Sequence, residues 1–323
     1  MEVNGLENMM NRMSCRKEYT FLDDYHIVNV LGKGSYGVVY QVRHKNSHQV
    51  YALKQMEFRS TAEGIPQSVL REVHLLKLLG RKRHPSILRL HDISHQLVKD
   101  DEMVQINLLV EKCDWDLFTF LQEIPKSLPE HQCRFIAMQL FRGLEFLHSN
   151  NVIHRDLKPQ NILINRDQTI RIADFGLSRN YSNTSAFTTL VVTLWYRSPE
   201  VLLQANYDSG TDIWSAGCII SELYNRQPLL PAQTEAEQLH IIFQLIGTPP
   251  IEEWPRESVV SHHSFVTYEP KPITNLNPNL HPKAAQLITE CLRFKVSKRF
   301  RAAEALKHPY FTEPQREIFK EIN

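Results

Sequence analysis

The chain has 323 residues, of which 42% are hydrophobic and 23% are charged, as in ordinary soluble globular proteins. At about 150 residues per domain, this length predicts two domains or lobes, each large enough to bury a core. The 37 basic and 36 acidic residues give a net charge of +1. This balance argues against nucleic acid or an anionic membrane surface as a partner, because both favour strongly basic proteins.

Cysteine usage and the start of the chain bear on the cellular compartment. The five cysteines are scattered without a CxxC pair, which favours free thiols in a reducing environment. Residues 1–20 contain no hydrophobic stretch typical of a signal peptide, and no apolar run approaches the roughly 18 residues that a membrane span needs. We therefore expect a protein of the nucleus and cytoplasm.

In chain order, a flexible tail over residues 1–20 is followed by short segments of alternating polarity up to Val110. Such segments are typical of antiparallel strands, and here they read YHIVNVLG, GVVYQVRH, QVYALKQM, ILRLHDI and VQINLLVE. One predicted helix interrupts them at GIPQSVLREVHLL, residues 64–76, where Val69, Val73 and Leu76 share an apolar face. Taken alone, the adjacent Arg71 and Glu72 favour a surface helix with two solvated charges.

After Glu111 the periodicity becomes helical, as in PEHQCRFIAMQLFRGLEFLHSN and SGTDIWSAGCIISELYN. A sheet followed by helices predicts an α+β chain of two lobes joined near residues 111–114. The predicted organisation is a tail over 1–20, an N-terminal lobe over 21–112, a C-terminal lobe over 113–312 and a second tail over 313–323.

The first motif that carries chemistry is GKGSYG, residues 32–37, a GxGxxG pattern followed by Val38. Alone it is weak, because the Rossmann fingerprint has the same spelling. Here, however, VVYQVRH continues as a strand, and a glycine turn between two strands lets backbone N–H groups approach phosphates. Lys54 follows on the next strand, 20 residues after Gly34.

Further motifs follow in the second half of the chain. IHRDLKPQNIL contains Asp156, Lys158 and Asn161, and IADFGLSR contains Asp174. SPE (198–200) and DIWSAGC (212–218) come later. Over residues 25–312 this ordered set resembles a eukaryotic protein kinase, and the form DLKPQN resembles the serine/threonine-specific branch.

The resemblance implies a bilobal kinase fold, ATP and Mg²⁺ as cofactors, and a role for each matching residue. Asp156 would accept the proton of the substrate hydroxyl, Lys158 would reach the γ-phosphate, and Thr193 belongs to the same catalytic set. Asn161 and Asp174 would hold Mg²⁺, and Lys54, paired with Glu72, would contact the α- and β-phosphates. The nucleotide site implied by the family comprises Gly32, Gly34, Gly37, Val38, Lys54, Val110, Glu111, Cys113 and Asp116.

The predicted helix resembles the PSTAIRE-type helix of cyclin-dependent kinases, with Pro66, Ser68, Arg71 and Glu72 at matching places. The segment FTTLVVTLWYRSPEVLLQANYDSGTDIWS is similar to the activation segment of that family, which makes Thr188 the expected phosphorylation site. A phosphate carries about −1.5 to −2 charges and needs cationic partners. The resemblance supplies them as Arg71, Arg155 and Arg179, so that Arg71 and Glu72 would serve two different switches.

The same family implies proline-directed specificity. Val192 and Arg197 match positions that shape the pocket for the residue after the phospho-acceptor, where a substrate N–H finds no partner and proline is favoured. Ser35 and Tyr36 match positions of inhibitory phosphorylation, although Tyr36 could equally cap the loop by packing. Val110 is smaller than the usual phenylalanine, which implies room for bulky adenine analogues.

The sequence therefore predicts a cyclin-activated, proline-directed serine/threonine kinase, most similar to the D-cyclin-dependent branch that acts in G1 on retinoblastoma-type substrates. A D-type cyclin, Ser/Thr-Pro protein substrates and cyclin-dependent kinase inhibitor proteins are the implied partners. Another cyclin-dependent kinase, including a transcriptional one, is the main alternative, and a pseudokinase scaffold is a further one. A mitogen-activated kinase is disfavoured because SAFTTLVV lacks Thr-x-Tyr. Ser198 replaces the usual alanine before Pro-Glu, and we expect Glu200 still to pair with Arg299.

Overall fold

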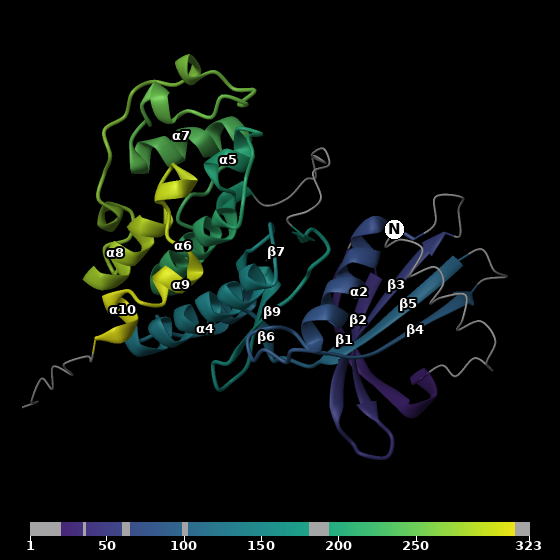
Figure 1. Ribbon diagram of the computed structural model, residues 1–323. Helices are drawn as coiled ribbons and strands as arrows, with labels where there is room; N and C mark the ends of the chain where they lie inside the picture. The colour runs from purple at the N-terminus through teal and green to yellow at the C-terminus, as the bar shows by residue number, and fades with distance from the viewer. Residues whose placement is uncertain (1–20, 35–36, 60–64, 99–102, 181–193, 314–323) are drawn as a thin grey trace, which may run out of the picture. The chain divides into compact units, whose positions relative to one another are not determined.

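The computed structural model describes residues 21–34, 37–59, 65–98, 103–180 and 194–313. The chain forms two compact units. The first contains Met1–Leu70 and Arg89–Lys112, and the second contains Arg71–Leu88 and Cys113–Asn323. A sheet makes up most of the first unit and helices dominate the second, which confirms the predicted α+β two-lobed kinase architecture (Figure 1).

The first unit is built on a five-stranded antiparallel sheet in the order β1-β2-β3-β5-β4, preceded by a 3-10 turn, η1. Alternation of apolar and polar residues places Val42, Leu53 and Leu109 in one buried cluster, where each is at most 2% exposed. Tyrosine rings from β1, β2 and β3 pack against this cluster. The elements are η1 (Phe21–Asp24), β1 (Tyr25–Gly34), β2 (Gly37–His44), β3 (Val50–Arg59), β4 (Leu90–Val98) and β5 (Met103–Glu111).

The predicted regulatory helix is α2 (Gln67–Gly80), which begins in the first unit and continues in the second. Pro66 precedes it, and the Pro66 carbonyl accepts the amides of Val69 and Leu70. The predicted apolar face is buried, as Val69, Val73 and Leu76 show. Glu72 is only 6% exposed and Arg71 is half-buried, so the alternative of two solvated charges is wrong.

The second unit consists of helices with two small sheets. Its longest helices, α4 and α6, correspond to the two helical segments predicted from the sequence. The helices are α3 (Leu117–Glu123), α4 (Glu130–Ser149), α5 (Pro199–Leu202), α6 (Gly210–Asn225), α7 (Glu235–Ile246), α8 (Pro282–Cys291), α9 (Ala302–Ala305) and α10 (Pro309–Thr312). The sheets are β6-β8-β9 (Trp115–Asp116, Ile162–Ile164, Ile170–Ile172) and β10-β7 (Arg179–Asn180, Val152–Ile153). The 3-10 turns are η2 (Pro159–Asn161), η3 (Leu194–Tyr196), η4 (Ile251–Glu253), η5 (His262–Ser264), η6 (Ile273–Asn275) and η7 (Val296–Lys298).

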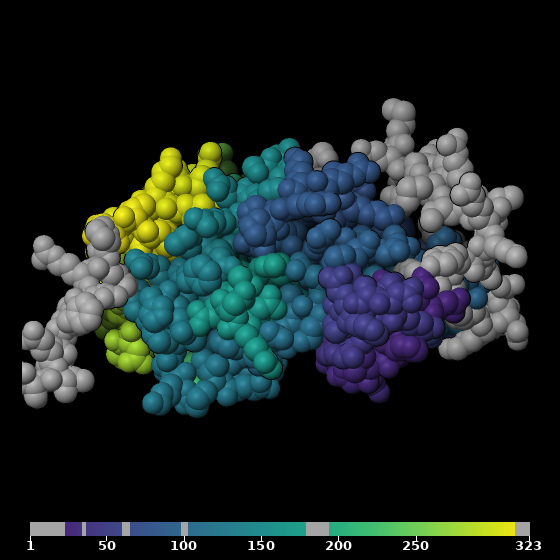
Figure 2. Space-filling model, turned by 90° about the horizontal axis from the view of Figure 1, so that it is seen from below, coloured from purple at the N-terminus to yellow at the C-terminus, as the bar shows by residue number. Residues whose placement is uncertain are grey.

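Helix α6 forms the centre of this unit, because nearly all of its side chains are buried between α4 and α8. A hydrogen-bonded cluster joins the helix ends, in which the Tyr224 hydroxyl donates to Glu130 at 2.5 Å and lies 2.8 Å from the Tyr310 hydroxyl. The C-terminal residues, yellow in Figure 2, accordingly lie against the teal residues of the same unit. No helix among the described residues has the length and apolar character needed to cross a membrane.

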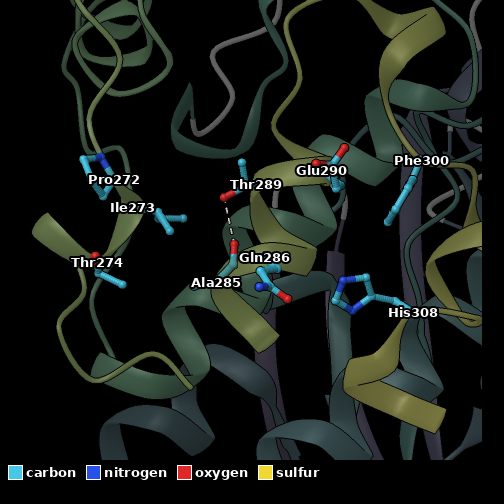
Figure 3. A pocket seen from close by; sticks show the side chains of 9 residues that line it. All are labelled: Pro272, Ile273, Thr274, Ala285, Gln286, Thr289, Glu290, Phe300 and His308. Atoms are coloured by element: carbon cyan, nitrogen blue, oxygen red, sulfur yellow. Dashed lines mark hydrogen bonds between the residues drawn. The ribbon is translucent and has the colours of Figure 1, made fainter. Parts of the chain in front are cut away.

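A hollow of about 520 Å³ opens beside α8 in the second unit (Figure 3). Its lining is mostly apolar or neutral, and the Thr289 hydroxyl donates to the Ala285 carbonyl at 2.8 Å within it. The one carboxylate in the lining, Glu290, is paired with Arg293 at 2.5 Å. None of the predicted site residues lines this hollow.

Candidate active site

The loop between β7 and β8 brings the predicted catalytic side chains together. Lys158 Nζ lies 2.8 Å from Asp156 Oδ2, and Asn161 Nδ2 donates to the same oxygen at 2.9 Å. Asn161 also donates to the Asp156 backbone carbonyl at 2.7 Å. The carboxylate is therefore fixed by one cation and one amide, a suitable arrangement for a group that must meet a substrate hydroxyl in a set position.

A buried carboxylate on α6 holds the backbone of this loop. Asp212 accepts the His154 amide at 2.9 Å and the Arg155 amide at 2.8 Å, and His148 Nε2 lies 2.9 Å from the same carboxylate. Burial acts to raise the pKa of Asp212, but the hydrogen bond and charge of His148, the charge of His154 and the Arg155 amide together lower it below its usual value. The carboxylate therefore stays charged and fixes the backbone directly before Asp156.

Asp174 follows strand β9 at the point where the chain turns away from the small sheet. Its φ of 61° lies in the left-handed region, and its side chain is exposed. The preceding residue, Ala173, donates its amide to the Asn161 carbonyl at 2.9 Å and receives His154 Nε2 on its own carbonyl at 2.9 Å. These bonds tie the two predicted magnesium ligands, Asn161 and Asp174, to one framework.

This framework fits magnesium. The Asn161 amide nitrogen is used on Asp156, so its oxygen is the atom left to serve as a ligand, and Asp174 adds a carboxylate. Magnesium is usually held by one or two such groups together with substrate phosphates rather than by an all-protein cage. The described residues contain no cluster of three or more His, Cys, Asp or Glu side chains able to hold a metal.

The first unit presents the predicted phosphate loop as the tip of the β1-β2 hairpin, with Gly34 opposite Gly37. Only glycine fits sterically at position 37, because a Cβ there would lie 1.9 Å from the Gln55 carbonyl oxygen. Lys54 is half-buried on β3 between Val39 of β2 and Leu108 of β5. Ser35 and Tyr36 lie outside the described residues.

Two of the three predicted phosphate-binding arginines converge in the second unit. Arg71 Nη1 donates to the Gly176 carbonyl at 3.1 Å, and Arg155 Nε donates to the next carbonyl, Leu177, at 2.6 Å. Arg155 Nη1 also donates to the Tyr207 hydroxyl at 2.6 Å, and its guanidinium lies 5.9 Å from the centre of that ring. The structure thus adds Tyr207, which no motif spacing indicated.

The remaining regulatory residues are described only in part. Arg179 is the first residue of β10 and pairs with Ile153. Thr188, Val192 and Thr193 fall outside the described residues. Their predicted roles therefore stay predictions, as does the pairing of Lys54 with Glu72, which belong to different units.

Comparison with known proteins agrees with this geometry. The family described as "Protein kinase domain" matches residues 25–311. The chain is 52% identical over 300 residues to "Cyclin-dependent kinase 4 homolog" of Caenorhabditis elegans, covering 92% of this chain and 74% of that protein. It is 42% identical over 290 residues to "Cyclin-dependent kinase 4" of Mus musculus (88% and 95% covered) and 41% identical over 290 residues to that of Xenopus laevis (90% and 91%). The chain belongs to the protein kinase family, among the cyclin-dependent kinases.

The activation segment of the kinase ends in a buried ion pair. Arg299 Nη1 lies 2.8 Å and Nη2 3.0 Å from the two carboxylate oxygens of Glu200, as predicted. Ser198, the residue that replaces alanine, is fully buried, and its hydroxyl lies 2.9 Å from that of Thr211. The serine therefore gains a hydrogen-bonding partner on α6 without disturbing the pair.

The predicted adenine and ribose contacts are distributed over the end of β5 and the residues after it. Val110 is 7% exposed on β5, and Glu111 Oε1 accepts the Arg89 amide at 2.8 Å. Cys113 is half-buried. Asp116 caps helix α3, with its carboxylate accepting the Thr119 amide at 2.8 Å and the Thr119 hydroxyl at 2.7 Å. The sequence reasoning missed this capping role, although an Asp directly before the first apolar residue of a helix is a known helix-start signal.

Proposed function

We propose that this serine/threonine kinase is activated by a cyclin of the D type and transfers the γ-phosphate of ATP to serine or threonine followed by proline. A retinoblastoma-type protein is the proposed substrate and promotion of G1 progression the proposed role. The observation that carries the catalytic part is the Asp156 carboxylate fixed by Lys158 and Asn161. Names of relatives at 41–52% identity support the cyclin dependence.

The proposed reaction is an in-line displacement that needs positioning and charge more than covalent chemistry. The substrate oxygen forms a bond to the γ-phosphorus, the bond to the ADP oxygen breaks, and the hydroxyl proton passes to Asp156. Lys158, 2.8 Å from the Asp156 carboxylate, brings a positive charge to the same place for the transferred phosphoryl group. Magnesium, held through Asn161 and Asp174, would supply further positive charge to the phosphate oxygens.

Lys54 and the glycine hairpin would bind the nucleotide phosphates, and Glu111 and Cys113 would bind adenine through backbone groups. Val110 would leave room behind the base. An ATP analogue with a bulky adenine substituent should therefore be accepted by the wild type and rejected by Val110→Phe. Equal exclusion by both proteins would contradict this part of the proposal.

We propose that regulation involves phosphorylation of Thr188 and recognition of the phosphate by Arg71, Arg155 and Arg179. The convergence of Arg71 and Arg155 on two consecutive carbonyls supports a shared cationic site. Cyclin-dependent kinase inhibitor proteins are proposed as further partners, and nucleus and cytoplasm as the compartments. Imaging of a tagged chain in cycling cells tests the location directly.

The deciding experiment is phosphorylation of a retinoblastoma-type Ser/Thr-Pro substrate by the purified protein. It is run without cyclin, with a D-type cyclin and with a mitotic cyclin, each beside Asp156→Asn. Asp167→Asn is the matched control, since the Asp167 carboxylate accepts the amide and the hydroxyl of Thr169 in an exposed turn. Activity that needs the D-type cyclin and disappears in Asp156→Asn supports the proposal.

Activation by the mitotic cyclin instead would support the catalytic mechanism but contradict the assignment to the D-cyclin-dependent branch. Silence in every mixture, with Thr188 phosphorylated and the nucleotide bound, would favour a pseudokinase scaffold and contradict the proposal.

A further inference from the structure

The residue proposed to shape the proline pocket, Arg197, is held by a residue that no motif assigns. Arg197 follows η3, and its amide donates to the Leu194 carbonyl at 2.9 Å. Its guanidinium Nη1 donates to Glu235 Oε1 at 3.1 Å. Glu235 is the first residue of α7, and the two side chains are 20% and 43% exposed.

The backbone around Glu235 is fixed by other groups. Thr234 caps α7 by accepting the Glu237 amide at 3.1 Å, and the Glu237 carboxylate accepts the Gln233 amide at 2.8 Å. The Trp195 indole N–H donates to the Ala232 carbonyl at 2.8 Å, which joins η3 to the segment before α7. The Glu235 carboxylate takes part in none of these bonds, so its contact with Arg197 can be removed without undoing the helix start.

We propose that Glu235 is a positioning residue that fixes the Arg197 guanidinium and thereby sets how strongly the kinase prefers proline after the phospho-acceptor. This inference rests on the proposed proline-directed function. A long arginine side chain samples many rotamers when unrestrained, and a carboxylate partner selects one of them before the substrate arrives. A guanidinium carries only N–H donors, so while it is held at the pocket it offers no acceptor to a substrate N–H, and proline, which lacks that N–H, is favoured.

The exposure of the pair decides where its effect will be measured. A half-exposed ion pair contributes little to folding stability because water already solvates both charges well. Solvation by water does not reduce the orienting effect of the ion pair on the pocket in the same way. The direction of the guanidinium matters only for a substrate that is bound there. Loss of Glu235 should therefore change selectivity and leave the thermal midpoint nearly unchanged.

The test uses the activated cyclin complex and two peptides that differ only in proline or alanine after the acceptor serine. Glu235→Gln keeps the size of the side chain and removes its charge. Glu237→Gln, in the same turn, is the matched control because its carboxylate supports the loop rather than Arg197. We expect the ratio of kcat/KM for the proline peptide over the alanine peptide to fall by up to about fivefold in Glu235→Gln only, the size expected of a half-exposed ion pair.

Glu235→Asp keeps the charge on a shorter side chain and should lie between wild type and Glu235→Gln, which protects the test if the glutamine variant folds poorly. An unchanged ratio in Glu235→Gln overturns the proposal, as does an equal fall in both Gln variants. If the wild type itself shows no proline preference, the proposed proline-directed function fails together with this inference.

Discussion

Replacement of Arg299 by methionine tests how the end of the activation segment is held to the second unit. Arg299 is 4% exposed, and its guanidinium bonds both carboxylate oxygens of Glu200 and the Gly210 carbonyl, the latter at 2.7 Å. The guanidinium carbon also lies 5.2 Å from the centre of the Trp214 ring. Methionine fills similar space without a charge, so the variant leaves the buried Glu200 carboxylate unpaired.

Removing one partner of a buried ion pair costs about 3–5 kcal/mol of unfolding free energy. For a unit of this size, each kcal/mol shifts the midpoint by roughly 2–4 °C, so we expect a fall of about 6–20 °C. The double variant Arg299→Met with Glu200→Leu buries no unpaired charge. It should therefore be more stable than Arg299→Met alone, because an apolar pair of similar volume replaces an ion pair at little cost.

The assay is urea unfolding of the purified protein, followed by intrinsic fluorescence, together with thermal unfolding of the same samples. Arg301→Met is the control, since Arg301 is exposed and its substitution should stay within about 0.5 kcal/mol of the wild type. A loss below about 1 kcal/mol in Arg299→Met, or a double variant no more stable than the single one, would refute the reasoning.

Three further predictions concern the glycine hairpin, the support of the catalytic loop and the phosphate site. Gly37→Ala places a Cβ 1.9 Å from the Gln55 carbonyl oxygen. Overpacking of this kind costs about 1–3 kcal/mol and should distort the glycine hairpin. The KM for ATP should therefore rise, while the KM for the protein substrate changes little. Because the folded pKa of Asp212 lies below its unfolded value of 3.8, its contribution to stability is complete above that pH and is lost as the pH falls through the lower folded value. Acid unfolding followed by circular dichroism should show this pH dependence in the wild type. In Asp212→Asn the dependence should be absent, and part of the stability at neutral pH should be lost. Tyr207→Phe keeps the ring beside Arg155 but removes their 2.6 Å hydrogen bond. Since a hydrogen bond to a charged group contributes about 1.5–3 kcal/mol, the gain in kcat/KM on activating phosphorylation should fall by at least about tenfold.

The grouping of the predicted catalytic residues could be anticipated because their interactions are local. Asp156, Lys158 and Asn161 lie in one short loop, so their spacing already encodes the hydrogen bonds that the structure contains. The supporting contacts have no such signal. His148 reaches Asp212 across 64 positions of the chain, and each residue alone is compatible with many roles.

The same distinction explains Tyr207 and Glu235, whose arginine partners are 52 and 38 positions away. No periodicity links a tyrosine after α5 to the catalytic loop, or the first turn of α7 to the activation segment. The ion pair of Glu200 with Arg299 spans 99 positions, yet it was predicted, because the family resemblance supplied the pairing that the residues alone do not.

The start of strand β4 was predicted wrongly for a related reason. The alternating segment over residues 87–93 predicts a strand, but β4 begins only at Leu90. Ile87 bridges to Ile172, and the Leu88 amide donates to the Ile172 carbonyl at 3.0 Å. The first residues of the apolar run therefore belong to the second unit, a long-range competition for backbone hydrogen bonds that local alternation does not reveal.

The position of Arg155 has a consequence for regulation. Its guanidinium binds the Leu177 carbonyl beyond Asp174, its amide binds Asp212, and the next residue is Asp156. The φ of Arg155 is 70°, a left-handed conformation that a non-glycine residue keeps only when its surroundings fix it. Under the proposed regulation, a phosphate bound by this guanidinium would act on a backbone that Asp212 holds in place. It would also lie beside the hydrogen bond from the Arg155 guanidinium to the Leu177 carbonyl, which links the catalytic loop to the start of the activation segment.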